Sequence, residues 1–273
     1  MLSLLKADLF RIFKGKLARI GLILAAALPI VIVLLYYAVE ASMNAMVDGE
    51  DITLSLFSSS SLIKSAFSVS DNIGLVIVIF SVIFVSLDIA NGTLRNKVIA
   101  GHSRTSIYCS HLLASVIYNL IMITIYASIT ILFTLILFKR NEPLPADELK
   151  GLVYSIIIGL VTYVFIATVT TFLALILGSI APSIILTVAY TMVIAFLTML
   201  FFFVFQMGIV EDAEKFEPLK YVLYFIPLFA NGSTLTVSEV NSTVFIEGMI
   251  SYLVFGGLNV FLGLLAFNKK DLK

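Results

Sequence analysis

Long apolar runs alternate with short polar segments along the whole chain. Six of the runs are long enough, or nearly so, to cross a membrane as helices: residues 17–39, 70–87, 112–138, 151–178, 183–205 and 248–267. A helix rises about 1.5 Å per residue, so a hydrocarbon core of roughly 30 Å takes about 20 apolar residues. The pattern predicts an all-α, polytopic membrane protein with one transmembrane domain over residues 1–273.

The second run is the shortest by strict hydropathy. Its continuous apolar part begins only at Ile73, and the residues before it include serine and asparagine. Such residues are tolerated at membrane depth where they face protein or water rather than lipid. We therefore expect this span to begin near residue 70.

Residues 1–16 have an amphipathic pattern instead. Four apolar residues recur at helical spacing: Leu2, Leu5, Leu9 and Ile12. The charged residues elsewhere on the helical wheel are Lys6, Asp8, Arg11 and Lys14. This pattern predicts a helix that lies in the inner membrane interface, as a surface anchor or as a docking surface for a partner.

Three connections between the predicted spans carry further signals. The stretch LFSSSSLIKSAFS, before the second span, combines serines with large apolar residues and predicts a short helix on the outer mouth. The sequence SIAPS at residues 179–183 predicts a tight inner turn. In residues 208–243, aromatic residues and Pro227 predict a broken, partly re-entrant segment before the last span.

Composition and charge support the membrane assignment and orient the chain. Hydrophobic residues make up 60% of the sequence and charged residues 12%, against about 45–50% and about 25% in soluble domains. With both termini inside, the inner segments hold eleven basic residues against three acids. Basic residues favour the cytoplasmic side, so we expect both termini in the cytoplasm. The zero net charge gives no indication of a nucleic-acid partner.

Motifs for chemistry within the chain are missing. The sequence contains neither GxxxxGK[ST] nor HExxH, and no ionisable residue lies in the middle of a predicted span. Gradient-driven transporters usually carry such residues, so this pattern disfavours a self-powered transporter. His102 and His111 are expected at the surface or interface rather than as metal ligands. We expect no enzyme activity, no metal and no cofactor in this chain.

One hydrophilic segment interrupts the apolar pattern on the inner side: DIANGTLRNKVIAGHSRTSIYCSH, residues 88–111. Asn91 or Thr93 is placed to cap a short helix, TLRNKVIA, and Gly101 to end it. The side chains that such a helix would present are Leu94, Val98 and Ile99 beside Arg95 and Lys97. On the residues alone, a simple connecting loop fits equally well.

This segment resembles the signature of type-2 ABC exporter permeases, which has an acidic residue, then Gly-Thr, then an arginine. Asp88, Gly92, Thr93 and Arg104 occupy those positions, although the family more often has Glu at the first of them. The C-terminal FNKKDLK and the six-span layout are also similar to that family, so the resemblance covers the whole chain.

The resemblance implies that residues 92–101 form a coupling helix that docks on a separate ATP-binding subunit. The apolar residues Leu94, Val98 and Ile99 would anchor it, while Arg95 and Lys97 would set the register and the charge at the rim. Thr93 and Arg104 would belong to the same docking segment. Gly92 would turn the chain, and Asp88 would cap or pair locally. ATP and Mg would bind the partner, and two such subunits would join two permease copies, identical or different, in a bacterial cell membrane.

The uncharged interior of the spans favours a lipophilic or amphipathic cargo. The chain is similar to small permeases that export antimicrobial or cytolytic peptides, such as lantibiotics and phenol-soluble modulins. Exporters of drugs, ions or lipid-linked glycans are alternatives within the same family. A non-transporting membrane sensor or scaffold is the alternative from another class.

Overall fold

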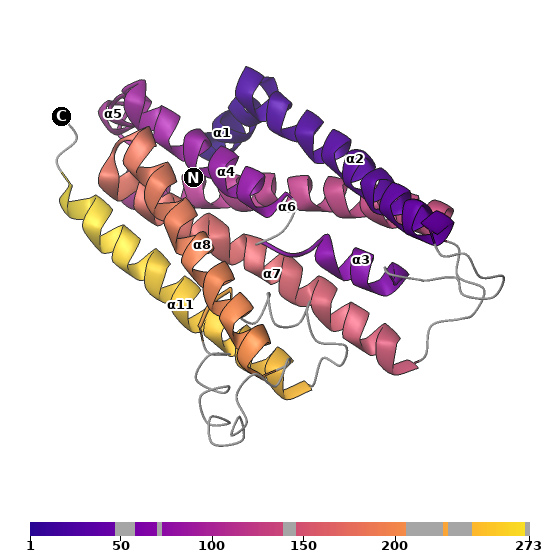
Figure 1. Cartoon of the computed structure of the whole chain (residues 1–273). Helices are drawn as coiled ribbons and strands as arrows, with labels where there is room; N and C mark the ends of the chain where they lie inside the picture. The colour runs from indigo at the N-terminus through magenta and orange to yellow at the C-terminus, as the bar shows by residue number, and fades with distance from the viewer. Residues whose placement is uncertain (47–57, 70–72, 139–145, 206–225, 229–241, 271–273) are drawn as a thin grey trace.

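The computed structural model describes residues 1–46, 58–69, 73–138, 146–205, 226–228 and 242–270. This part is almost entirely helical and holds no strand, so the predicted all-α fold is confirmed (Figure 1). The longer helices are α2 (Lys16–Met46), α4 (Gly74–Ala90), α6 (Arg104–Leu137), α7 (Ala146–Leu177), α8 (Ile180–Phe205) and α11 (Ser242–Lys269). The shorter helices are α1 (Leu2–Lys14), α3 (Ser59–Ser65) and α5 (Thr93–Ile99).

Five of the described helices are long and apolar enough to cross a membrane: α2, α6, α7, α8 and α11. The number rises to six if α4 and α5, which are bent by 58° relative to each other, form one broken span. Helix α4 has 17 residues and is about 26 Å long, less than the roughly 30 Å of a hydrocarbon core. It is therefore short, as its sequence predicts, and its expected extension to residue 70 lies outside the described residues.

Helices α6 and α7 form the centre of the bundle. Helix α7 packs against α4, α6, α8 and α11, and α6 packs against α1, α2 and α4 as well. Hydroxyl groups join α7 to its neighbours inside the bundle. The hydroxyl oxygens of Ser81 in α4 and Thr170 in α7 are 3.0 Å apart, and those of Thr162 in α7 and Tyr252 in α11 are 2.8 Å apart. Such contacts between buried hydroxyls are a common form of helix association in membranes.

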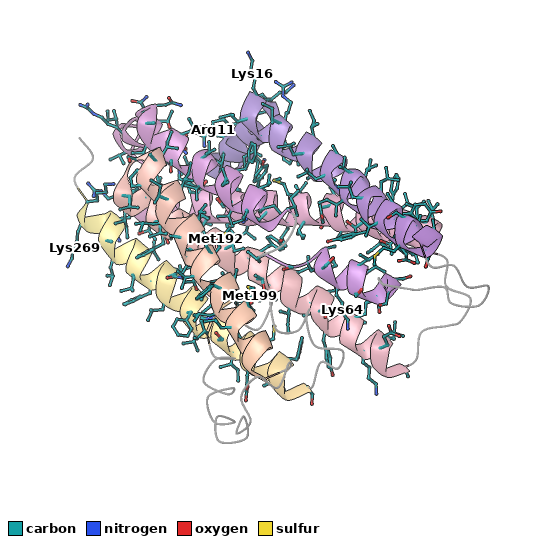
Figure 2. All side chains as sticks on the ribbon, in the orientation of Figure 1. Arg11, Lys16, Lys64, Met192, Met199 and Lys269 are labelled. Carbon is teal, nitrogen blue, oxygen red and sulfur yellow. The ribbon has the colours of Figure 1, made fainter. Side chains whose placement is uncertain are left out.

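The outer faces of the helices carry large apolar side chains. Ile23 in α2 and Leu253 in α11 are exposed, and α8 turns Met192 and Met199 outward (Figure 2). This arrangement is the one expected of helices whose outer surface meets lipid rather than water.

Two of the connections have the local structure predicted for them, a short helix and a tight turn. Helix α3 begins after Ser58, whose Oγ accepts a hydrogen bond from the Ser61 amide, and it packs against α6 and α7. Between α7 and α8 only Gly178 and Ser179 intervene, and Gly178 has a φ of +70°, so this turn is tight. The predicted re-entrant segment at 208–243 lies almost wholly outside the described residues.

The beginning of α6 brings the two ends of the described chain together. Ser110 donates a hydrogen bond of 2.6 Å to Asp8 Oδ2 in α1. Arg104 donates one of 2.9 Å to the carbonyl oxygen of Asn268 in α11. Both ends of the described chain therefore lie at the same end of the bundle, where α5 is also found (Figure 1).

Candidate functional site at the α4–α5 bend

The bend between α4 and α5 depends on two residues that follow α4. Asn91 continues the last turn of α4, and Gly92 then adopts a φ of +67°, which a residue with a side chain adopts only at a cost. Gly92 itself is the N-cap of α5, with no side-chain hydrogen bond, so neither Asn91 nor Thr93 caps this helix as predicted. The Thr93 hydroxyl instead lies 2.8 Å from both the main-chain oxygen and Oδ1 of Asp88.

The end of α5 follows its prediction. Gly101 has a φ of +86°, and its amide donates a hydrogen bond of 3.0 Å to the carbonyl oxygen of Val98. The next amide, that of His102, reaches back to the Lys97 carbonyl at 3.2 Å. This is the usual way in which a glycine in the left-handed region ends a helix. α5 is therefore a discrete helix of seven residues between two glycines.

A cluster of ionisable side chains lies under α5. It is formed by Asp8 and Arg11 from α1, Asp88 from α4, Lys97 from α5 and His111 from α6, and we call it the charge cluster. Lys97 Nζ lies 2.7 Å from Asp8 Oδ1, 3.1 Å from Asp88 Oδ2 and 3.2 Å from His111 Nε2. One side chain of α5 therefore contacts three other helices.

Arg11 completes the cluster from the opposite side. Its guanidinium pairs with the Asp88 carboxylate and lies over the Phe84 ring, 5.0 Å from the ring centre. His111 Nε2 is 3.0 Å from Asp88 Oδ2, so Asp88 receives contacts from α1, α5 and α6. The local pairing predicted for Asp88 is present, and Asp88 also contacts side chains of the more distant helices α1 and α6.

The charge cluster is electrically balanced and largely buried, with the Arg11 side chain 36% exposed at its edge. The side chains of Asp8 and Lys97 are 2% and 14% exposed, and those of Asp88 and His111 are fully buried. Two carboxylates face two cations, which is how buried charges are tolerated. Burial raises the pKa of Asp8, but His111, Lys97 and Ser110 lower it by more, so this pKa lies below its ordinary value. Burial lowers the pKa of the Arg11 guanidinium, which Asp8 partly offsets.

The cluster has the ligand types of a metal site but supplies its own cation. One ligand atom each from Asp8, Asp88 and His111 lie within 4.8 Å of one another, a geometry that can hold a metal ion. The Lys97 ammonium contacts all three side chains and so takes the position that an ion would need. The expectation that this chain has no metal stays a prediction.

The predicted docking side chains of α5 divide between two faces. Arg95 and Ile99 are exposed, and Ile99 is 73% exposed. Leu94 is 2% exposed, Val98 packs beside it in the same apolar cluster, and Lys97 enters the charge cluster. Leu94 and Lys97 are thus directed into the chain, because their positions on the helix face α4 and α6. Asn96 joins Arg95 and Ile99 on the outer face.

Arg104, which the resemblance places in the docking segment, holds the end of α11. Its Nη1 donates to the carbonyl oxygens of Phe267, Asn268 and Lys270 at 3.3, 2.9 and 2.5 Å. Lys270 Nζ in turn donates to the carbonyl oxygens of Leu175 and Ile176 at 2.8 and 3.0 Å. These cations satisfy the free carbonyls at the ends of α11 and α7.

Asp8, Arg11 and His111 are the site residues that the sequence interpretation missed. His111 is fully buried, so its expected surface or interface position is wrong. Asp8 is buried rather than on a solvated face of α1. A signal was present, because Leu4, Asp8 and Ile12 recur every four residues and form the buried stripe of α1. A carboxylate in the middle of such a stripe indicates a buried cation or hydrogen-bond donor that pairs with it, because unpaired charges are not tolerated in the interior.

Comparison with known proteins yields a family without an assigned activity. No curated protein matches the sequence. The family described as "Protein of unknown function (DUF2705)" matches residues 43–273, more than four fifths of the chain. The match includes Asp88, Lys97 and His111, whereas Asp8 and Arg11 precede it. The chain therefore belongs to the DUF2705 family of proteins of unknown function.

Proposed function

We propose that the chain is the permease subunit of an ATP-driven exporter of the type-2 ABC class. The observation that carries the proposal is that one side of α5 is bonded to the bundle while the other side is exposed. Its inner side is fixed to α1, α4 and α6 through Lys97, while its outer side presents Arg95, Asn96 and Ile99. A force applied to the outer side is transmitted to three helices at once, which is the property required of a coupling helix.

The proposed partner is a separate ATP-binding subunit that docks on the outer face of α5. Ile99 is an exposed apolar anchor next to a cation, Arg95, and interfaces commonly combine a buried apolar contact with charges at the rim. ATP and Mg bind to that partner. Two such subunits and a second permease copy, identical or different, complete the transporter.

The proposed location is the cytoplasmic membrane of a bacterium, with α1, α5 and the end of α11 on the inner side. These elements share one end of the bundle, and that end carries the basic residues at positions 6–19, 95–104 and 269–270. An excess of basic residues favours the cytoplasmic side. The ATP-binding subunit would therefore find α5 in the compartment that contains ATP.

We propose a lipophilic or amphipathic cargo, with antimicrobial or cytolytic peptides as the leading hypothesis. The polar groups buried among the long helices beyond the charge cluster are mainly hydroxyls and amides, such as Thr130, Thr170 and Asn119. A bundle interior with few charges favours uncharged or amphipathic cargo over ions. Stimulation of ATP hydrolysis by a panel of amphipathic peptides, compared with drugs and lipid-linked glycans, would distinguish the cargo classes.

The docking face can be tested by co-expression with candidate ABC ATP-binding subunits. Arg95→Glu combined with Ile99→Asp is expected to abolish co-purification of the ATP-binding subunit without changing the amount of permease in the membrane. Lys269→Glu reverses an exposed charge at the same end of the bundle and serves as the control. Undiminished co-purification with the double variant would contradict the docking role.

A further inference from the structure

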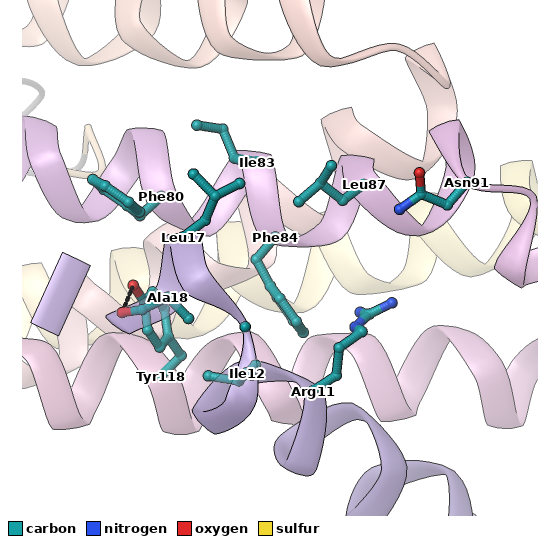
Figure 3. Close-up of a pocket in the computed structure, with 11 residues that line it drawn as sticks. Arg11, Ile12, Leu17, Ala18, Phe80, Ile83, Phe84, Leu87, Asn91 and Tyr118 are labelled. Carbon is teal, nitrogen blue, oxygen red and sulfur yellow. Dashed lines mark hydrogen bonds between the residues drawn. The ribbon is translucent and has the colours of Figure 1, made fainter. Parts of the chain in front are cut away.

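A cavity of about 230 Å³ lies between the α1–α2 elbow, α4 and α6 (Figure 3). One face of α4 forms its long wall, with Phe80, Ile83, Phe84, Leu87 and Asn91. Leu17 and Ala18, just after the elbow, line the opposite side, and Arg11 lies toward the Asn91 end. The cavity is therefore apolar along its length, with polar groups at one end.

The length of the cavity corresponds to one membrane leaflet. Phe80 and Asn91 are eleven residues apart on one helix face, or about 16 Å. This is about half of a hydrocarbon core of roughly 30 Å. Asn91 follows the last residue of α4, so the cavity runs from the end of a span, where lipid headgroups lie, to about the middle.

The α1–α2 elbow, whose Gly15 lines the cavity, has an excess of positive charge just outside the lining residues. Lys14 and Lys16 flank Gly15 at the elbow, and Arg19 follows one turn later. These three cations are exposed and form no ion pair within the described part of the chain. The sequence contains no acidic residue between Asp8 and Glu40. An anionic headgroup is the complement of this elbow, whereas a cationic peptide would be repelled from it.

We infer that the cavity binds one acyl chain of an anionic phospholipid, with the phosphate at the α1–α2 elbow. The volume is below the range of about 300–1,000 Å³ for sites that enclose whole small molecules, so it suits a single chain. The bound lipid would fill the space between the elbow and α4, and so support the position of α1, which carries Asp8 and Arg11. This inference does not depend on the exporter proposal.

Photocrosslinking with the full chain in lipid nanodiscs tests the inference. The probes are phosphatidylglycerol and phosphatidylcholine that carry the same diazirine on one acyl chain, and mass spectrometry maps the labelled peptides. We expect labelling within residues 11–18 and 80–91. Each lysine or arginine near an anionic membrane surface contributes a factor of about five in binding, so labelling by the anionic probe should exceed that by the zwitterionic probe at least about fivefold.

Variants separate the cavity from the general lipid-facing surface. Ala18→Phe places a ring in the cavity and should remove the labelling of residues 80–91, whereas Ala27→Phe, on an exposed face of α2, should leave it unchanged. Replacing the exposed Lys14, Lys16 and Arg19 together by glutamine leaves the buried core intact and should abolish the preference for the anionic probe.

Two results would overturn the inference. The first is equal labelling by the two probes in the wild-type chain, or labelling of residues 80–91 that Ala18→Phe does not reduce. The second is displacement of the label by an amphipathic peptide but not by unlabelled phosphatidylglycerol, which would assign the cavity to a peptide. Neither result bears on whether an ATP-binding subunit docks on α5, so the two proposals fail separately.

Discussion

Lys97 Nζ lies 2.7 Å from Asp8 Oδ1 and so joins α5 to the N-terminal helix across 89 residues of sequence. Both side chains are largely buried, and Asp88 and His111 contact the same ammonium. Removing one partner of a buried pair leaves an uncompensated charge, which costs about 3–5 kcal/mol. α5 therefore cannot move away from α1 and α4 without a large cost, and we expect these elements to move as a unit.

The Asp8–Lys97 pair should show strong coupling in stability. Asp8→Asn leaves Lys97 with only one of its two carboxylates, and Lys97→Met leaves Asp8 with only the more distant Arg11, so each should lower the free energy of unfolding, by up to about 3–5 kcal/mol. The double variant removes both charges and should cost clearly less than the sum of the two. Thermal unfolding in detergent would measure this. The control is Lys6→Met, at an exposed position of α1, which should change the free energy of unfolding by no more than about 0.5 kcal/mol. If the costs of Asp8→Asn and Lys97→Met simply added in the double variant, the pairing would be contradicted.

Removing the Lys97 ammonium should convert the charge cluster into a metal site. In Lys97→Ala, Asp8, Asp88 and His111 keep ligand atoms within 4.8 Å of one another, and the Arg11 guanidinium beside Asp88 is the cation that remains in the charge cluster. Zinc prefers such nitrogen and oxygen ligands, and saturating metal at about 100 times its Kd stabilises a protein by about 2.7 kcal/mol. Zn²⁺ should therefore raise the Tm of Lys97→Ala but not that of the wild type.

The control for this prediction is the same variant without its nitrogen ligand. Lys97→Ala combined with His111→Ala should lose the response to Zn²⁺. An equal rise in Tm for the wild type and for both variants would indicate binding elsewhere, and would contradict the view that Lys97 takes the place of an ion.

A close approach between α11 and α6 gives a prediction about packing. A methyl group at Gly263 would overlap the hydroxyl of Tyr108, which is fully buried. Gly263→Ala should therefore destabilise the protein by about 1–3 kcal/mol. Gly257→Ala lies on the same helix with open space around it, so it should be neutral or stabilise by up to about 1 kcal/mol.

The assignment of this clash to Tyr108 can be checked separately. Tyr108→Leu removes a large buried side chain and should destabilise the wild type, but it should cost less in the Gly263→Ala background. The apparent Tm in detergent is the measurement. Equal costs in the two backgrounds would show that the two residues do not pack against each other.

Hydropathy predicted the long helices because each apolar run is a local property of the sequence. The helix at Thr93–Ile99 was also predictable, since Gly92 and Gly101 mark its two ends. The capping of this helix was not, because Thr93 bonds to Asp88 in the preceding helix instead. Local signals therefore placed the elements but not the contacts between them.

The charge cluster could not be assembled from the sequence for a physical reason. Hydropathy counts each charged residue as if it stood alone, whereas Asp8 and Lys97 are tolerated in the interior only because they meet there. The same contact directs Lys97 away from the surface on which a partner was expected. Within the described residues Lys97 is paired and Arg95 is exposed, and only tertiary structure shows this difference between the two cations of α5.

We propose above all that this chain is moved by ATP hydrolysis on another polypeptide. The most direct measurement is vanadate-sensitive ATP hydrolysis in reconstituted vesicles, for the chain alone and for its complex with a co-expressed ABC ATP-binding subunit. We predict hydrolysis by the complex, loss of the complex with Arg95→Glu and Ile99→Asp, and no hydrolysis by the chain alone. Uphill solute movement by the chain alone, or a failure of every candidate ATP-binding subunit to form a complex, would contradict the claim.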